Sequence, residues 1–317
     1  MQTENHGHLP IQISFLAMTT SIAAIDQVIN DLIKHAELPQ SFRLLVDDIY
    51  LPLAEIINQR WQQKQAPLFV SVNGAQGSGK STLTEFLKVI LETAYERSAV
   101  SISIDDFYLT RQQREHLSKT IHPLLLTRGV PGTHDLPMME QVFKDLIAGR
   151  SVYLPRFDKA QDDRLIETTP ALQTSVDIIL FEGWCNNSLP ESQQSLSVPV
   201  NELEINEDPD GSWREFVNQQ LKLYQEKVFS LADLKIMLLI ADFELVYQWR
   251  KKQEDKLRGK QSVSDNKVMN EQQLQRFIQH YERITRNNIA ELPGKVDIVL
   301  PLNKDHCITE IRMQDHE

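Results

Sequence analysis

Short apolar runs recur along the chain, and amphipathic helical stretches lie between several of them. Five runs have the length and the apolar content of strands that are buried on both faces. They cover residues 68–72, 100–104, 177–181, 236–240 and 296–300. Because parallel strands need a crossover connection, usually a helix, this alternation predicts an α/β fold with a doubly wound, mainly parallel sheet.

The residues before the first run follow a helical pattern instead. Apolar side chains recur at three- and four-residue spacing from Ile22 to Ile33 and again from Ile49 to Trp61. This stretch carries no motif with evident chemistry. We therefore predict an N-terminal helical extension over residues 1–66, packed on a larger domain over residues 67–317.

The composition excludes several classes of protein. With 41% hydrophobic residues, the chain of 317 residues can bury a substantial core, so it is not a disordered protein. Its formal net charge of −11 argues against a nucleic-acid partner, because phosphate backbones are bound by basic surfaces. Cys185 and Cys307 are too few for a disulfide framework, and no stretch has the length and apolar content of a membrane span. Secretory signals and transit peptides need basic residues, but no Lys or Arg precedes Lys34. We therefore predict a cytoplasmic protein.

The 68–72 run leads into a glycine-rich turn and then into a helical pattern. Gly74, Gly79, Lys80 and Ser81 fit the motif G-x-x-x-x-G-K-[ST], whose backbone N–H groups cradle phosphates. Lys80 is expected to reach the outer phosphates of a nucleotide, and the Ser81 hydroxyl is expected to ligate its Mg²⁺. The strand before the turn and the helix after it argue against a chance match. We assign nucleotide binding to Asn73, Gly74, Ala75, Gln76, Gly77, Ser78, Gly79, Lys80, Ser81 and Thr82.

Carboxylates stand where two of the predicted strands end, which is where parallel sheets bind ligands. Asp105 and Asp106 follow the 100–104 run, and one of them can take the proton of an acceptor hydroxyl while the other faces a metal. Alternatively, they only cap the turn. Glu182 follows the 177–181 run, as in the second nucleotide-binding signature, in which a carboxylate orients Mg²⁺ or its water.

Two further segments indicate a small anionic partner. Arg128 and His134 precede an amphipathic helix that Asp135 is well suited to cap, and Arg156 opens a second charged segment. Because arginine binds a carboxylate through two parallel hydrogen bonds, Arg128, His134 and Arg156 suit an anionic, hydroxylated small molecule. Residues 186–212 are rich in Ser, Asn, Glu and Pro, and we interpret them as a surface insertion.

Basic residues cluster after the 236–240 run. They are Arg250, Lys251, Lys252, Lys256, Arg258 and Lys260. Such a run is either a solvated helix face or a lid, over residues 242–265, that closes on phosphates and excludes water. Near the C-terminus, Asn303 and Lys304 resemble the start of the guanine-reading motif N-K-x-D, but His306 replaces its aspartate, which favours ATP over GTP.

Six segments together resemble the phosphoribulokinase, uridine kinase and pantothenate kinase group of P-loop kinases, and within it the D-glycerate 3-kinases of the plant and cyanobacterial type. They are NGAQGSGKST (73–82), SIDDFYLT (103–110), RGVPGTHD (128–135), PRFDKAQDDR (155–164), ILFEGWC (179–185) and VDIVLPLNKDH (296–306). RGVPGTHD and PRFDKAQDDR are quite specific, whereas the phosphate loop is shared by many families. The polar 186–212 segment is where the chain departs from the family.

The resemblance implies a P-loop NTPase fold that uses ATP and Mg²⁺. It also implies that Asp105 is the base, that Asp135 lies at the acceptor hydroxyl, and that Arg250 belongs to the lid. Glu182 matches the carboxylate that ends the third strand. The expected activity is ATP-dependent phosphorylation of a small hydroxy acid, D-glycerate, at position 3, with Lys80 and Asp105 as catalytic residues. The alternatives are a kinase of the same fold with another acceptor, such as pantothenate or a nucleoside, and an ATP-binding regulatory protein.

Overall fold

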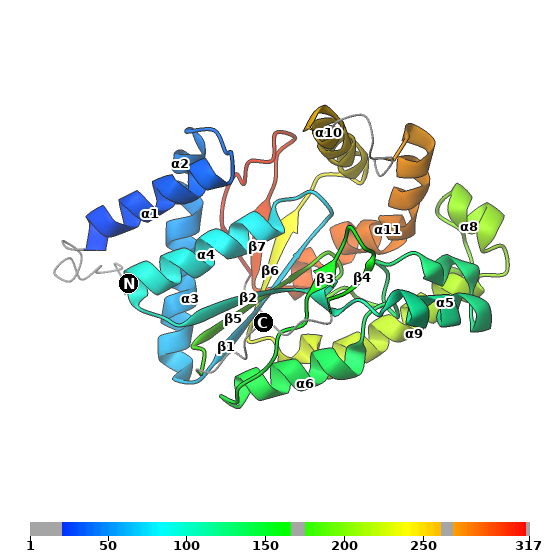
Figure 1. The fold of residues 1–317 in the computed structure, drawn as a ribbon, viewed down its shortest axis with the longest axis horizontal. Coiled ribbons are helices and arrows are strands. Elements are labelled where there is room, and N and C mark those ends of the chain that lie inside the picture. The colour runs from blue at the N-terminus through cyan, green and yellow to red at the C-terminus, as the bar shows by residue number, and fades with distance from the viewer. Residues whose placement is uncertain (1–20, 166–174, 261–268, 315–317) are drawn as a thin grey trace, which may run out of the picture.

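A six-stranded sheet forms the centre of the part of the chain that the structure describes (Figure 1). The structure is a computed structural model, and it describes residues 21–165, 175–260 and 269–314. In their order across the sheet, the strands are β2 (Ala99–Ser103), β5 (Ile178–Gly183), β1 (Leu68–Gly74), β6 (Leu234–Leu239), β7 (Ile298–Pro301) and β8 (Arg312–Met313). The first five run parallel, and the short edge strand β8 is antiparallel to β7.

Alternate side chains of the central strands enter two different hydrophobic clusters, because successive side chains of a strand point to opposite faces of the sheet. In β1, Val70 and Val72 belong to one cluster, whereas Phe69 belongs to the other. In β5, Leu180 and Phe181 divide in the same way. A continuous apolar run therefore serves both faces, and the sheet needs helices on each of them.

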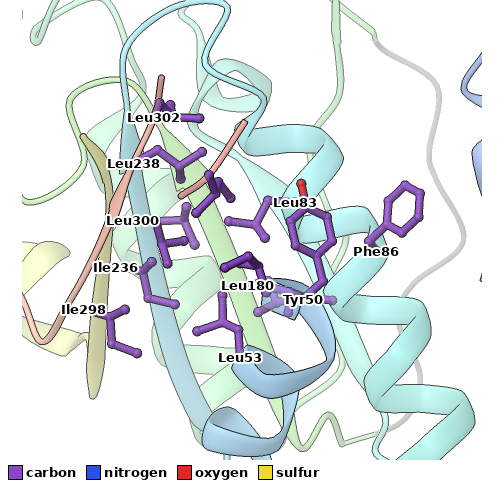
Figure 2. Packing of buried hydrophobic residues seen from close by; sticks show 14 of the residues in the cluster. Tyr50, Leu53, Leu83, Phe86, Leu180, Ile236, Leu238, Ile298, Leu300 and Leu302 are labelled. Carbon is purple, nitrogen blue, oxygen red and sulfur yellow. The ribbon is translucent and has the colours of Figure 1, made fainter. Parts of the chain in front are cut away.

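The first face is covered by helices from the N-terminal part of the chain. These are α1 (Ser21–His35), α2 (Phe42–Leu45), the π-helix η1 (Val46–Tyr50), α3 (Leu51–Lys64) and α4 (Lys80–Tyr95). Figure 2 shows Tyr50 and Leu53 among side chains of α4 and the sheet, including Phe86 and Leu180. The ring centroids of Tyr50 and Phe86 are 5.7 Å apart. The N-terminal helices thus share one core with the sheet.

The second face is covered by α6 (Leu136–Ile147) and α9 (Ser212–Lys227). The ring of Phe143 on α6 lies 4.7 Å from the ring of Phe69 and 4.5 Å from that of Phe181, measured between centroids. Such aromatic pairs stabilise a core by about 0.5–1.5 kcal/mol each beyond the area that they bury.

The remaining elements connect and extend these layers. They are η2 (Ile104–Phe107), α5 (Arg111–Thr120), η3 (Pro123–Leu126), β3 (Phe157–Asp158), β4 (Asp163–Arg164), α7 (Gln193–Leu196), α8 (Glu202–Glu207), η4 (Phe229–Leu231), α10 (Glu244–Lys260), α11 (Glu271–Glu291) and η5 (Pro293–Lys295). Strands β3 and β4 form a small antiparallel hairpin of their own. None of the described helices is long and apolar enough to cross a lipid bilayer.

The prediction of an α/β P-loop fold with a mainly parallel, doubly wound sheet is confirmed, and each predicted strand lies within a few residues of an observed one. Strand β8 and the β3–β4 hairpin escape prediction, because two-residue strands leave no periodicity to read. The predicted lid range contains α10, whose Leu245, Val246 and Trp249 are buried against the core. Its last residues, 261–265, lie outside the described part of the chain.

The prediction that residues 186–212 are a surface insertion is wrong for residues 186–188 and for part of α8, whereas most of residues 192–212 are exposed. Asn186, Asn187 and Ser188 are almost fully buried, and so is Glu204 of α8. The composition misleads because part of this polar segment is hydrogen-bonded inside the protein. Asn186, for example, donates its side-chain amide to the carbonyl oxygen of Phe181 at 3.0 Å.

A buried ion pair fixes this segment to α11. Arg283 Nε donates to Glu204 Oε1 at 2.8 Å, and Arg283 Nη2 donates to Glu204 Oε2 at 2.6 Å. The side chains of Arg283 and Glu204 are 8% and 0% exposed. A carboxylate this deep is tolerated only while its cation is present, because water cannot replace the lost partner.

We therefore expect Arg283→Met to lower the free energy of unfolding by about 3–5 kcal/mol, since it leaves Glu204 buried without a cation. Urea unfolding followed by circular dichroism measures the change. The matched control is Arg286→Met, one turn along the same helix, where the more exposed arginine pairs with Glu244 and Glu282. That control should cost no more than about 1 kcal/mol. Equal losses from the two variants would contradict a special role for the buried pair.

Candidate active site

The turn between β1 and α4 has the backbone curvature of a phosphate loop. Gly77 and Gly79 have φ angles of 80° and 91°, in the left-handed region that glycine adopts without strain. At Gly74, an added Cβ would lie 2.7 Å from Ser78 Oγ and 3.0 Å from Leu238 Cβ, so the chain passes too closely for a side chain. The N-cap residue of α4 is Gly79, which has no side chain to occupy the first N–H groups of the helix. These groups and the positive end of the helix dipole suit a polyphosphate.

The predicted phosphate-binding lysine lies at this turn. Lys80 Nζ donates to the carbonyl oxygen of Ala75 at 3.1 Å. Burial lowers the pKa of Lys80, although the neighbouring carboxylates of Glu182 and Asp105 oppose this effect. An ammonium group that has already lost much of its hydration interacts more strongly with an incoming phosphate than a hydrated one does.

The predicted metal pair also meets at the turn. Ser81 Oγ donates to Glu182 Oε1 at 2.9 Å. The register of the sheet explains the contact, because Glu182 of β5 pairs with Val72 of β1 on one side and with Ser103 of β2 on the other. Hydroxyl and carboxylate oxygens are ligands that Mg²⁺ prefers, so the two residues fit this ion. Among the described residues, no group of three or more His, Cys, Asp or Glu side chains could hold a metal.

The assignment of the whole 73–82 stretch to the nucleotide is wrong for the side chain of Asn73. This side chain is buried, and its amide donates to the carbonyl oxygens of Asn186 at 2.6 Å and Trp184 at 3.3 Å. It holds the loop that follows β5 and is not available to a ligand. Ala75 and Ser78 are buried within the turn, whereas Gln76 and Thr82 are partly exposed there.

Backbone pairing joins the two aspartates after β2 to the 128–135 segment. Tyr108 and His134 form an antiparallel bridge, and their rings stack with centroids 4.6 Å apart. The N–H group of Leu109 donates to the carbonyl oxygen of Thr133 at 2.9 Å. Segments that the sequence could only predict separately are thus held side by side.

Asp105 accepts hydrogen bonds from two side chains. Lys159 Nζ lies 2.6 Å from its Oδ2, and Tyr108 Oη lies 2.8 Å from its Oδ1. Burial favours the protonated form, but Lys159 and Tyr108 outweigh it and lower the pKa of Asp105. At Asp106, burial outweighs the ion pair that Arg156 makes at 2.9 Å and raises the pKa of that carboxyl group. Asp105 is therefore the more readily ionised of the two.

The predicted substrate contacts Arg128 and Asp135 are engaged with other protein groups. Arg128 pairs with Asp162, and its guanidinium carbon lies 5.5 Å from the ring centre of Phe157. Asp135 caps α6, as its sequence position predicts, by accepting from the N–H group of Met138 at 3.1 Å. Its other oxygen lies 3.2 Å from Arg164 Nη2.

His134 cannot supply the positive charge that the sequence pattern suggested for it. Burial lowers the pKa of His134 to about 4, although Asp105 opposes the shift, so the imidazole is neutral near pH 7. His134 Nδ1 lies 3.0 Å from Tyr224 Oη, which also accepts a hydrogen bond from the N–H group of Gly132 at 2.9 Å. The sequence could not reveal this burial, because Tyr224 belongs to the distant helix α9.

Tyr108, Lys159 and Arg164 are not among the site residues assigned from the sequence, although Lys159 ends the charged segment 156–159 that suits an anionic molecule. Each contacts one of the predicted aspartates, at Asp105 or Asp135. The sequence feature that could have pointed to Lys159 and Arg164 is the density of charged residues in PRFDKAQDDR, the segment that forms the β3–β4 hairpin. Nothing in that pattern shows that the hairpin folds over Asp105.

Arg250, the predicted lid arginine, lies on α10. Its Nη2 is 2.9 Å from Glu254 Oε1, and its guanidinium carbon is 5.9 Å from the ring centre of Phe277 on α11. The ring of Phe277 packs against Tyr281, whose hydroxyl donates to the carbonyl oxygen of Arg128 at 3.1 Å. A contact between Arg250 and a nucleotide stays a prediction.

Comparison with known proteins finds related kinases. The uncharacterized kinase mug58 of Schizosaccharomyces pombe is 30% identical over 278 residues, which cover 84% of this chain and 94% of that protein. The chain belongs to this family of P-loop kinases.

A further relative and a solved structure are also kinases. The chloroplastic D-glycerate 3-kinase of Arabidopsis thaliana is 30% identical over 73% of this chain, which spans only 50% of that protein's length. A solved D-glycerate 3-kinase from Cryptococcus neoformans has a TM-score of 0.69 and 26% identity, and the match covers 84% of this chain and 99% of that one. No protein-family model matches the chain. The resemblance to the P-loop kinases is confirmed.

The contact between Ser81 and Glu182 leads to a prediction about Mg²⁺. Ser81→Ala should weaken binding of Mg²⁺·ATP by about 10- to 100-fold, because the predicted ligand of the metal is lost. Binding of ATP in EDTA should change little. Calorimetric titration with and without Mg²⁺ measures both constants. Ser230→Ala is the control, since that exposed hydroxyl donates to the carbonyl oxygen of Glu226 on α9 at 2.9 Å. Equal weakening of ATP binding with and without Mg²⁺ would contradict a metal-directed role for Ser81.

Proposed function

We propose that the protein transfers the γ-phosphoryl group of ATP to the 3-hydroxyl of D-glycerate. The observation that carries the proposal is the position of Asp105, which shares one edge of the sheet with the phosphate loop and forms an ion pair with Lys159. Two relatives named D-glycerate 3-kinase support this acceptor. Because His306 stands where a guanine-reading motif has aspartate, we propose ATP as the donor.

In the proposed reaction, the residues of this chain position the two substrates and move one proton. The N–H groups of the turn and the Lys80 ammonium hold the β- and γ-phosphates. Asp105 takes the proton of the acceptor hydroxyl as its oxygen forms a bond to the γ-phosphorus. The bond between that phosphorus and the β,γ-bridging oxygen breaks, and ADP leaves with the electron pair.

Ser81 and Glu182 would hold the Mg²⁺ that accompanies the nucleotide. When bound, the ion neutralises charge that develops on the phosphate oxygens. Their mutual hydrogen bond holds the two oxygen ligands next to each other. This preorganisation lowers the cost of binding.

The acceptor would lie between Asp105 and the 128–135 segment. Arg128 and Arg156 carry the charge that suits a carboxylate, and Asp135 would lie at the acceptor hydroxyl. Because Tyr224 Oη already accepts from a backbone N–H group, its proton can go to His134 Nδ1. The neutral His134 would then offer an Nε2–H donor to the substrate.

We propose that this reaction takes place in the cytosol. Cys185 is buried and Cys307 is exposed, and both are free thiols. An exposed free thiol suits a reducing compartment.

The acceptor is tested by a coupled assay of ADP release over D-glycerate, L-glycerate, other hydroxy acids, sugars, pantothenate and nucleosides. We expect D-glycerate to give the highest kcat/KM, with 3-phosphoglycerate as the product by NMR. A higher kcat/KM for pantothenate or a nucleoside would replace the acceptor but keep the kinase. ATP binding without turnover on any compound would favour a regulatory protein.

The role of Asp105 gives a second prediction. Asp105→Asn keeps the size of the side chain but cannot accept the proton, so kcat should fall by about 10²- to 10⁴-fold. The Kd of ATP should be preserved, because the phosphates are held by the turn. Asp106→Asn is the matched neighbour and should lose less activity. If Asp106→Asn were the inactive variant, the two aspartates would have the opposite roles.

A further inference from the structure

The β3–β4 hairpin carries an exposed lysine directly onto the proposed base. Lys159 lies in the turn of the hairpin, and its side chain is 61% exposed. Its Nζ is 2.6 Å from Asp105 Oδ2, while the hydroxyl of Tyr108 donates to Oδ1. Both carboxylate oxygens of Asp105 therefore accept a hydrogen bond from a protein side chain.

The base of the hairpin is tied to the protein by other charges. Arg164 Nη2 donates to the carbonyl oxygen of Tyr108 at 3.0 Å and lies 3.2 Å from Asp135. Arg114, which is 1% exposed, holds Asp162 at 3.0 Å. These contacts fix the frame of the hairpin, whereas Lys159 reaches Asp105 through a long, solvated side chain. An ion pair with such exposure is weak and is easily exchanged for another anion.

Lys159 differs from Arg156 and Arg164 in the carboxylate with which it is paired. Arg156 and Arg164 are paired with Asp106 and Asp135, neither of which is the proposed base. Only a movement of Lys159, among the charged contacts that the structure describes here, would free Asp105. A base held by an ammonium group accepts a proton poorly, because the ion pair stabilises its charged form.

We propose that Lys159 recognises the carboxylate of the acceptor and releases Asp105 when it does so. This inference rests on the proposed function. A hydroxy acid carries an anion and a hydroxyl on one small molecule, so its carboxylate can take Lys159 while its hydroxyl takes the freed Asp105. The base would then become available only when an acidic acceptor is bound. Selection of an acid over a neutral alcohol would follow from this exchange.

The exchange predicts a change in the pH dependence of the reaction. Asp105 is influenced by charged and titratable groups on several elements: Lys159, Tyr108, His134, Lys80, Asp106, Tyr281 and Cys185. Lys159 lowers the pKa of Asp105, so its removal raises that pKa. The acid limb of kcat/KM should therefore move to higher pH in Lys159→Met, which a purely structural role would not cause.

The test compares D-glycerate with its neutral amide, D-glyceramide, in the full-length protein with Mg²⁺·ATP. In Lys159→Met, the ratio of kcat/KM for the acid over the amide should fall by about 10- to 100-fold, mainly through KM, because a hydrogen bond between charged groups is lost. Lys159→Arg should restore part of the ratio. Lys144→Met is the matched control, since this exposed lysine also makes a 2.6 Å ion pair, with Glu140 on α6. That variant should leave the ratio unchanged.

Each other outcome has a separate meaning. Equal losses on the acid and the amide would show that Lys159 serves the nucleotide, and an unchanged ratio would show that it does not read the carboxylate. Both results would overturn the role of Lys159 while leaving D-glycerate as the acceptor. If the wild-type protein neither binds nor phosphorylates D-glycerate, the proposed acceptor fails, and this role fails with it.

Discussion

The parallel register of three strands is the constraint on which the site depends. Glu182 of β5 lies between Val72 of β1 and Ser103 of β2, so the carboxyl ends of all three strands are level at one edge of the sheet. A shift of one residue in β5 would turn Glu182 to the other face and remove it from Ser81. The phosphate loop, the Ser81–Glu182 pair and Asp105 therefore lie close together because of hydrogen bonds between backbone groups of the strands, in which no side chain of the site takes part.

The charge around the site is opposite in sign to the net charge of the whole molecule. A protein with a net charge of −11 repels a polyanionic nucleotide at long range. Around the site, helix N–H groups and the cations of Lys80, Arg128, Arg156 and Lys159 reverse this field over short distances. Several of these cations are paired with carboxylates of the protein, which lowers the net positive charge of the site.

The sequence predicts the sheet and the phosphate loop well because both depend on local patterns. Apolar runs specify buried strands, and the glycines of 74–79 specify a turn whatever surrounds it. It predicts less well where distant segments decide a residue's role. The burial of His134 depends on Tyr224, and the side chain of Asn73 is committed to Asn186. Composition also misleads at 186–188 and at Glu204, whose side chains are buried although they are polar.

The strand order of the sheet has a consequence for how the chain is made. Strand β1 pairs with β5 and β6. Leu68 therefore pairs with Ile178, and Val70 pairs with Leu234, both of which come much later in the chain. During synthesis from the N-terminus, the apolar β1 therefore emerges long before its neighbours exist. Folding must close large loops before these contacts form, which makes it slow compared with a helical bundle. The phosphate loop precedes β5 and β6 in the chain, yet the strand that leads into it gains both neighbours only after these two strands have been translated.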